Sequence, residues 1–211
     1  MKVTDFQIEE INYKTAKPFI EKWHYSNSVR GLHIEHCFNL TSPDGSFGLP
    51  RMIGAMIYGK PAMPDVSKKY CKDNPDIVLE LNRLCCIDET PKNTESYFIG
   101  QTFKLLKKLT DYKVIVSFAD EEYGHKGVIY KATNFQHCGK TSPGRTLIVD
   151  GEEYHARSLN QPIKPYSREI RKRYDAKDPN IYWKHTKQKN IYVYFLDRKA
   201  KKKFDFESIK Q

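Results

Sequence analysis

The sequence predicts an α/β protein built on one mixed β-sheet with helices on both of its faces. Three observations predict this class. Residues 114–119 form a continuous apolar run of strand length, which is typical of a strand buried on both faces. Residues 32–40 alternate between apolar and polar side chains, as a half-buried strand does. Between such strands lie segments whose apolar residues recur at helical spacing. Two packed layers of this kind form an α/β domain.

In the first half of the chain, the apolar pattern predicts a helix and three strands. Ala16, Phe19, Ile20 and Trp23 fall near helical spacing. In the strand at 32–40, even-numbered residues share one face and odd-numbered residues the other, so His33 and His36 point in opposite directions. The expected elements are a short strand near 6–11, a helix at 15–23, a strand at 32–40, a turn at 42–45, a second strand at 52–58 that completes a hairpin, and a proline-rich loop at 59–75.

The second half alternates strands and helices. A leucine-rich segment predicts a strand, and a helix follows because its apolar residues line one side. The Asp150-Gly151 pair between two short strand-like runs predicts a tight hairpin. The expected elements are a strand at 77–87, a helix at 94–109, the buried strand at 114–119, a short helix within 124–134, a hairpin at 146–157, a helix near 166–174 and a strand at 191–196.

Composition narrows the class of protein. The chain has 211 residues, 39% of them hydrophobic, so it can bury a core and is not a disordered sequence. No apolar stretch approaches the ~18 residues of a membrane span, and the first residues lack the apolar core of a signal peptide. Five irregularly spaced cysteines do not suggest a disulfide framework, and no CxxC pair suggests a zinc ribbon. We therefore expect a cytoplasmic protein with no membrane partner.

The positive charge is concentrated at the end of the chain. Residues 161–211 carry 15 basic and 6 acidic side chains, whereas residues 1–160 are close to neutral although the whole chain has a formal charge of +10. Aromatic residues are interleaved with these cations, a combination that suits nucleic acid because cations neutralise phosphates and rings stack on bases. A solvated basic tail packed on the main domain is the alternative. The sequence therefore predicts a domain at 1–160 and a basic extension at 161–211 in which Lys184, Lys187 and Lys189 contact nucleic acid.

Several segments resemble a known family. They are Leu79-Glu80-Leu81-Asn82-Arg83-Leu84, residues 91–100 (Pro-Lys-Asn-Thr-Glu-Ser-Tyr-Phe-Ile-Gly), Ser117-Phe118-Ala119-Asp120, residues 127–135 and the His24-Tyr25 pair. Over roughly residues 20–160 the chain resembles the Mom family of phage DNA-modification proteins, which are similar to GNAT acyltransferases. The resemblance implies a GNAT-like sheet and transfer of a methylcarbamoyl-type group to adenine N6, which protects phage DNA from restriction. It also implies double-stranded DNA and a small-molecule acyl donor as partners.

The GNAT resemblance also implies where the donor binds. In such a core a loop and a helix N-terminus hold the pyrophosphate of coenzyme A, because free N–H groups and the helix dipole favour anions. That place falls on Asn93, Thr94, Ser96 and Gly100 in this chain. The usual glycine-rich loop is replaced by Asn-Thr-Glu-Ser-Tyr-Phe, so the expected donor is acetyl-CoA, another CoA-type donor, or a different acyl donor.

Four residues are candidates for catalysis. Asp120 ends a strand at the edge where α/β sheets bind ligands, and it is either a base or orienting group or an N-cap. Tyr130 is either a general acid beside the leaving group or a half-buried helix aromatic. His24 has a pKa suited to proton transfer, although a histidine near a helix end is often a cap or surface residue. Tyr25 is a candidate through its match to the family.

Arg83 is the remaining candidate for the donor site. An inward-facing arginine can hold a phosphate or carboxylate with two hydrogen bonds, whereas an outward one pairs with Glu80 or Asp88.

Glu80 is a weaker candidate for a base. Arg157 is expected to face substrate or DNA phosphate from the hairpin at 146–157. Iron or zinc remains open as a cofactor, but no ligand spacing indicates either metal.

Two alternatives to a DNA-adenine transferase stay open. The same fold could transfer an acyl group to another amine, such as a different modified base, an RNA or a protein lysine, because a fold does not dictate a substrate. The chain could also bind DNA without catalysis. The sequence leaves the oligomeric state open, a homodimer included.

Overall fold

The computed structural model describes residues 2–45, 49–154, 157–160 and 164–202. The strands are β1 (Gln7–Ile11), β2 (His33–Ser42), β3 (Arg51–Lys60), β4 (Val78–Cys86), β5 (Val114–Asp120), β6 (Gln136–Lys140), β7 (Gly144–Val149), β8 (Glu152–Tyr154), β9 (Ile181–Thr186) and β10 (Lys189–Phe195). The α-helices are α1 (Tyr13–Trp23), α2 (Pro64–Tyr70), α3 (Thr94–Leu109), α4 (Val128–Ala132), α5 (Arg157–Asn160), α6 (Pro165–Asp175) and α7 (Arg198–Lys202). Short 3-10 helices lie at Val3–Asp5, Pro75–Ile77 and Glu121–Tyr123. None of the helices in the described ranges is long and apolar enough to cross a membrane.

The chain forms two compact units. Unit 1 comprises Met1–Ala119, His125–Gly139 and Asn190–Gln211, and unit 2 comprises Asp120–Gly124 and Lys140–Lys189. Residue 160, where the basic extension is expected to begin, falls inside unit 2.

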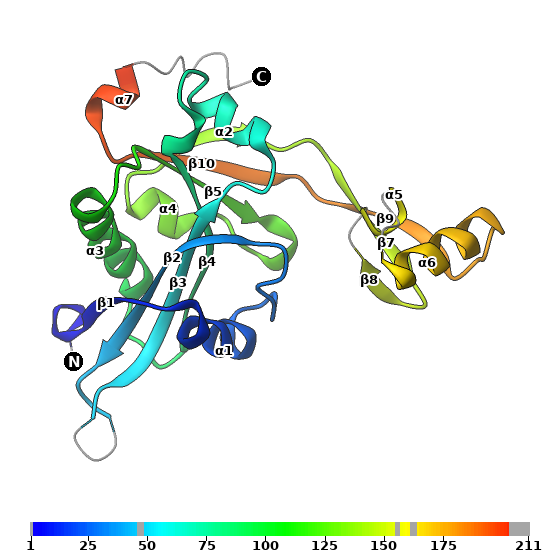
Figure 1. Ribbon diagram of the computed structural model, residues 1–211. Helices are drawn as coiled ribbons and strands as arrows, with labels where there is room; N and C mark the ends of the chain where they lie inside the picture. Colours follow the sequence, from blue (N-terminus) through cyan, green and yellow to red (C-terminus); the bar gives the residue numbers. More distant parts are fainter. Residues whose placement is uncertain (1, 46–48, 155–156, 161–163, 203–211) are drawn as a thin grey trace. The chain divides into compact units, whose positions relative to one another are not determined.

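Unit 1 is organised around a mixed sheet in the order β1-β2-β3-β4-β5-β10-β6 (Figure 1). Strands β1 to β4 pair antiparallel, and β4 pairs parallel with β5. One face is covered by α3 and α4, which pack against alternate residues such as Met56, Tyr58 and Ile115. Ala55, Ile57 and Val114 point to the opposite face, toward α1 and α2. The predicted mixed sheet with helices on both faces is confirmed.

The strand β2 departs from the predicted alternation. A register shift between Ile34 and His36 marks a β-bulge, which reverses the side-chain order along the strand. Ile34 therefore packs in the cluster of Cys37 on the α1 face, whereas His36 lies beside Phe38 with ring centroids 6.4 Å apart. The prediction that Ile34 and Phe38 share one face was wrong.

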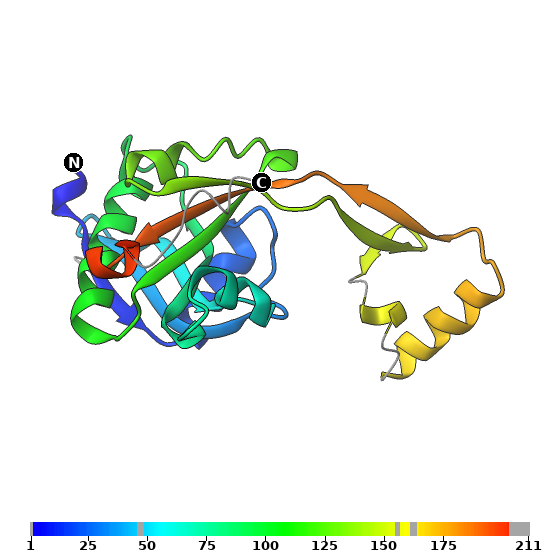
Figure 2. The ribbon, with the colours of Figure 1, turned by 90° about the horizontal axis from the view of Figure 1, so that it is seen from above.

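Unit 2 is a small antiparallel sheet with a helix packed on it (Figure 2). Its strands lie in the order β8-β7-β9, and the β7–β8 turn is formed by Asp150 and Gly151, both at positive φ, as the predicted hairpin requires. Helix α6 packs its Ile170 against Leu147 and Ile181. The unit therefore has its own small apolar core.

Candidate active site

The strands β4 and β5 separate at the middle of the unit 1 sheet. Their parallel pairing covers three residue pairs and ends at Glu80 and Val116, although both strands continue, to Cys86 and Asp120. A register shift in the β3–β4 pairing makes Asn82 a bulge residue on β4. Beyond the last pair, the backbone ladder between β4 and β5 stops in the described residues. This opening lies at the carboxyl ends of parallel strands, where α/β proteins bind ligands.

Ser117 and Tyr130 meet at this opening. The Ser117 hydroxyl lies 3.0 Å from the Leu81 carbonyl oxygen and 2.9 Å from the Tyr130 hydroxyl. The Tyr130 ring comes from α4 and is held by Tyr192, whose ring stacks on it at 4.9 Å, and by Phe135 at 5.1 Å in an edge contact. A buried hydroxyl pair thus bridges β4, β5 and α4 where the two strands part.

The phenol of Tyr130 is protonated in this setting. Burial raises the pKa of its phenol to about 12, and the hydrogen bond from Ser117 partly opposes that rise. The phenol therefore stays protonated at neutral pH. Ser117 has one proton and the Leu81 carbonyl can only accept, so Ser117 donates either to Leu81 or to the phenol oxygen. In the first arrangement the phenol donates to Ser117; in the second its proton is free for another group, as a general acid requires.

The His24-Tyr25 pair follows directly after α1. His24 is the C-cap of this helix and is only 5% exposed, whereas Tyr25 is 43% exposed. The ring of Tyr25 lies between His24, at 4.2 Å, and His125, at 4.8 Å. The structure therefore presents one buried and one exposed ring, and Tyr25 interacts electrostatically with both Arg83 and Tyr130.

The hydrogen bonds of His24 fix its tautomer. The backbone N–H of Ser26 donates to Nδ1 at 3.1 Å, and the Ser26 hydroxyl lies 2.8 Å from the same nitrogen. Because a backbone N–H can only donate, Nδ1 is the acceptor and Nε2 carries the proton of the neutral ring. Burial lowers the pKa of His24 to about 4, and the charges of Arg83 and His125 act in the same direction. His24 is therefore a neutral hydrogen-bond donor at pH 7 rather than a ready proton acceptor.

This lowered pKa predicts an acid-dependent loss of stability. The unfolded chain binds a proton at this imidazole near pH 6.5, whereas the folded chain resists protonation down to about pH 4. The contribution is complete above pH 6.5 and is lost as pH falls to about 4, with a size of roughly 2–4 kcal/mol. We expect the free energy of unfolding of His24→Gln, measured by urea titration, to fall less than that of wild type across this window. Parallel curves for the two proteins would contradict the assignment.

Arg83 joins the loop after α1 to the β4 bulge. Its Nε donates to the Ser28 carbonyl at 3.0 Å, and a terminal nitrogen donates to the Asn82 carbonyl at 2.7 Å. Burial lowers the pKa of the guanidinium, and Tyr25 and Glu80 oppose this effect. A guanidinium has five N–H groups, and two of them bond to backbone carbonyls here. The remaining donors can bind an anion or a carbonyl oxygen.

The N-terminus of α3 holds the four residues expected at the donor site. Asn93 is the N-cap in a left-handed conformation, and its side chain makes no capping bond. The Thr94 hydroxyl is buried and donates to the Pro91 carbonyl at 2.6 Å, so it has a structural partner. Ser96 is half-buried in the first turn of α3. A Cβ added at Gly100 would meet no atom within 4 Å. Burial raises the pKa of Cys86 at the end of β4, and the charge of Glu95, also in the first turn of α3, adds to that rise.

The other predicted residues lie in unit 2. Asp120 pairs with Lys189 at 2.8 Å and accepts a hydrogen bond from the backbone of Glu122. Lys184 pairs with Glu153 at 3.0 Å and with Glu122 at 3.8 Å, whereas Lys187 is exposed. The side chain of Arg157 lies outside what the structure describes. The structure thus brings His24, Tyr25, Arg83 and Tyr130 together in unit 1.

Sequence reasoning did not assign roles to three members of this cluster. Ser117 lies inside an apolar run, and its hydroxyl, buried in a strand, is the one signal that could have been noticed. His125 and Tyr192 join the cluster through ring contacts with Tyr25 and Tyr130. Nothing in their local sequence indicates these contacts, because each depends on the tertiary fold.

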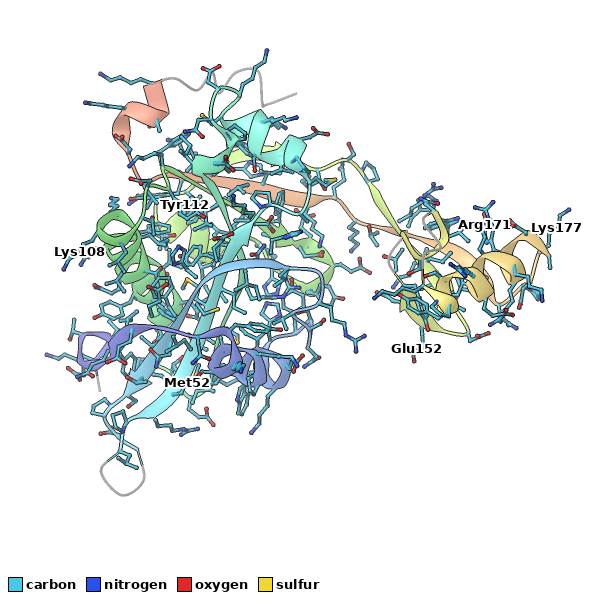
Figure 3. All side chains as sticks on the ribbon, viewed as in Figure 1. Met52, Lys108, Tyr112, Glu152, Arg171 and Lys177 are labelled. Atoms are coloured by element: carbon cyan, nitrogen blue, oxygen red, sulfur yellow. The ribbon has the colours of Figure 1, made fainter. Side chains whose placement is uncertain are left out.

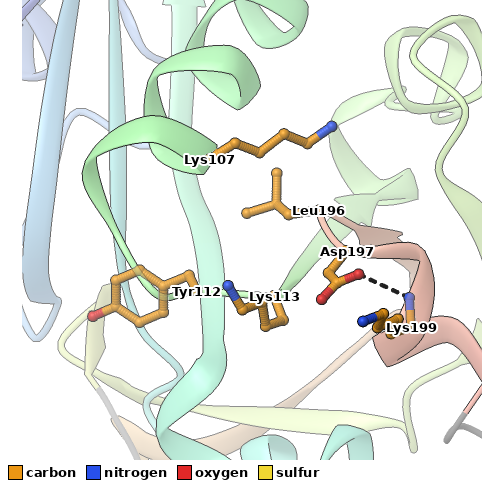
Figure 4. Close-up of a pocket in the computed structure, with 6 residues that line it drawn as sticks. All are labelled: Lys107, Tyr112, Lys113, Leu196, Asp197 and Lys199. Atoms are coloured by element: carbon orange, nitrogen blue, oxygen red, sulfur yellow. Dashed lines mark hydrogen bonds between the residues drawn. The ribbon is translucent and has the colours of Figure 1, made fainter.

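A separate cavity of about 450 Å³ lies elsewhere in unit 1 (Figure 4). It is lined at the amino end of β5 by Tyr112 and Lys113 and beyond β10 by Leu196, Asp197 and Lys199, with Lys107 from α3. Asp197 accepts a bond from the Lys199 backbone at 2.8 Å. The cavity is at the opposite end of β5 from the strand opening. In the described ranges, no three His, Cys, Asp or Glu side chains are grouped to hold a metal ion.

The chain has a fold of a known class, similar to that of the GNAT acetyltransferases. Ribosomal-protein-S5-alanine acetyltransferase from Vibrio fischeri has a TM-score of 0.50 at 8% identity, over 92% of this chain and 94% of that one. Spermidine/spermine N-acetyltransferase from Vibrio cholerae also has a TM-score of 0.50 at 8% identity, over 95% and 98%. At these identities the likeness shows the fold, and the predicted GNAT-like class is confirmed.

Sequence comparison identifies the family of this chain within the fold class. The model of the Mom protein family matches residues 5–210, so this chain belongs to the Mom family. A curated relative, the methylcarbamoylase Mom of Escherichia phage Mu, is 26% identical over 208 residues, which are 98% of this chain and 82% of the relative. The predicted family is confirmed.

Proposed function

We propose that this chain is a transferase that places a methylcarbamoyl or other acyl-type group on the N6 amine of adenine in DNA. The family match over residues 5–210 and the name of the phage Mu relative support this assignment. The observation that carries it in the structure is the meeting of a protonated Tyr130, a neutral His24 and a cationic Arg83 beside the β4–β5 opening.

The chemistry demands three kinds of group. The lone pair of the N6 nitrogen is delocalised into the ring, so a proton must leave as the N–C bond forms. Negative charge develops on the donor carbonyl oxygen and needs hydrogen-bond donors, and the leaving group needs a proton. The unit 1 cluster offers a candidate for each of these needs.

The proposed roles follow from the protonation states. Arg83 and the Nε2–H of His24 stabilise the carbonyl oxygen. Tyr130 gives its proton to the leaving group as the donor's acyl bond breaks. Glu80, a half-buried carboxylate whose charge acts on Arg83 and Tyr130, accepts the N6 proton as the new N–C bond forms. The role expected for Asp120 stays a prediction.

The donor is the second substrate of the proposal. A CoA-type thioester fits the GNAT fold, and the first-turn N–H groups of α3 are not capped by the Asn93 side chain. Ser96 would contact the donor, and the absence of a side chain at Gly100 would leave room for it. Adenine has to leave the base stack before its amine can enter a pocket of this kind.

The proposal is tested by nucleoside mass spectrometry of plasmid DNA and total RNA from bacteria that express the chain. We expect a new adenosine-derived mass in DNA that is absent with His24→Ala, and the added mass identifies the group. Matching thermal unfolding of the two proteins serves as the control for folding. A modified nucleoside in RNA alone would favour an RNA acyltransferase, and unmodified nucleic acids from folded protein would overturn the transferase assignment.

A further inference from the structure

The cations of unit 2 fall into two groups. Five of them pair with carboxylates: Lys140 with Glu121, Arg171 with Asp175, Arg173 with Asp150 and Asp178, Lys184 with Glu153, and Lys189 with Asp120. Such pairs satisfy the charge locally and leave little attraction for an external anion. The cations without a carboxylate partner are therefore the ones to consider as a binding surface.

Three unpaired cations form one row on α6. Lys164, the N-cap, and Arg168 and Lys172 follow each other at i, i+4 and i+8, which places them on one side of the helix. All three are exposed, and they make no ion pair with any residue that the structure describes. We call these three residues the α6 row. Arg171, labelled in Figure 3, is on the same helix but is paired with Asp175 at 2.9 Å.

The packing of α6 keeps this row directed outward. Ser167 and Ile170 are buried, and Ile170 joins the apolar cluster formed with β7 and β9. Arg168 and Lys172 lie roughly opposite these residues at 100° per residue. The helix is therefore held by one side; Arg168 and Lys172 are presented on the other, and Lys164 flanks them at the N-terminal end.

An aromatic ring lies at the start of the row. Tyr166 is 49% exposed, its centroid is 6.0 Å from the Lys164 ammonium, and Tyr154 from β8 lies 6.3 Å away. No exposed leucine, isoleucine, valine or phenylalanine lies on α6, so the helix lacks the apolar side of a membrane-surface helix. A row of cations with one adjoining ring fits a nucleic-acid backbone better than a lipid surface.

The length of the row suits a phosphate backbone. At about 1.5 Å per residue, the row from Lys164 to Lys172 is about 12 Å long. Phosphates of one B-DNA strand recur every roughly 3.4 Å along the axis, so the row can follow about three of them.

We propose that the α6 row binds the phosphate backbone of double-stranded DNA, with Lys164, Arg168 and Lys172 as the contacts. The inference rests on the proposed function in that DNA is taken as the substrate. It shifts the DNA contact from Lys184 and Lys189, which are engaged with carboxylates, to α6. Because phosphate contacts carry no sequence information, the row fixes the position of the duplex and does not select the base.

The test compares two triple variants of the full chain. Lys164→Gln/Arg168→Gln/Lys172→Gln removes the α6 row, and Lys140→Gln/Arg171→Gln/Lys184→Gln removes three paired cations and the same net charge. Binding to a fluorescent duplex is measured by anisotropy at several salt concentrations. Each lost phosphate contact lowers the salt slope by about 1, so we expect a decrease of about 3 for the α6-row variant and the wild-type slope for the control.

The outcomes separate this inference from the proposed function. Equal slopes for the two variants, with thermal unfolding unchanged, would overturn the α6 row even if DNA is modified. A loss of binding to phosphatidylserine vesicles without a loss on the duplex would also overturn it. A decreased slope in a chain that leaves DNA unmodified would support the row and contradict only the transferase assignment.

Discussion

Replacing Tyr130 with phenylalanine is expected to lower the rate of DNA modification by about 10²–10⁴-fold, the range for loss of a general acid. The phenol is the protonated group at the β4–β5 opening, with its pKa raised by burial to about 12. Without it, the leaving group must depart unprotonated or take its proton from water. The effect should fall on the chemical step, because the phenylalanine ring retains the volume of the tyrosine ring.

The fold should tolerate this change. The ring contacts of Tyr130 with Tyr192 and Phe135 involve carbon atoms that phenylalanine keeps. Ser117 loses one partner but keeps the Leu81 carbonyl, so its buried hydroxyl remains hydrogen-bonded. We expect the thermal midpoint to change by only a few degrees.

The measurement is a single-turnover rate with saturating donor and DNA, beside duplex affinity by anisotropy. Ser117→Ala is the companion variant, since it removes the hydrogen bond to Tyr130 and keeps the phenol. It should lose less activity than Tyr130→Phe. A Tyr130→Phe protein with the wild-type rate would rule out the acid role.

Much of unit 1 could be predicted because its elements carry strong local patterns. The apolar residues of α3 and the continuous run of β5 define these elements without tertiary information. The helix α2 was missed because three prolines between residues 59 and 75 suggested a loop. Pro64 is at the first turn of α2, where proline is tolerated because its missing N–H has no helical partner.

The strands β6 and β9 were missed for another reason. The sequence of β6, Gln-His-Cys-Gly-Lys, has few apolar residues. That of β9, Ile-Tyr-Trp-Lys-His-Thr, places its three apolar and aromatic residues side by side and shows no clear alternation. They become strands because neighbours distant in sequence pair with them, as Val149 of β7 does with Ile181 of β9. Local propensity is a weak guide where pairing decides.

The site was predictable only in part. The family resemblance singled out His24, Tyr25, Arg83 and Tyr130, which the structure brings together, and it could not give their protonation states. Those depend on burial, which lowers the pKa of His24 from the ordinary value on which its selection for proton transfer rested, and on the Ser26 N–H at Nδ1. Lys184 and Lys189 illustrate the opposite failure, because a count of cations does not reveal which ones are paired with carboxylates.

Gly127→Ala is expected to destabilise the protein by about 2–5 kcal/mol and to reduce modification with it. Gly127 is the N-cap of α4 at φ +70°, a conformation that disfavours a side chain by about 1 kcal/mol or more. A Cβ there would also overlap the hydroxyl and ring of Tyr192. Overpacking of this kind adds about 1–3 kcal/mol. Because Tyr192 stacks on Tyr130, its displacement would move the acid as well.

Gly124→Ala provides the matched control. Gly124 has φ +76°, nearly the value of Gly127, but a Cβ at Gly124 meets nothing within 4 Å. The two substitutions therefore share the backbone strain and differ in the contact with Tyr192. Urea unfolding should show a loss of about 1 kcal/mol for Gly124→Ala. A larger loss for Gly127→Ala that shrinks to that of Gly124→Ala when it is measured in a Tyr192→Ala background would assign the difference to the ring. Equal losses in the wild-type background would show that backbone conformation alone explains both.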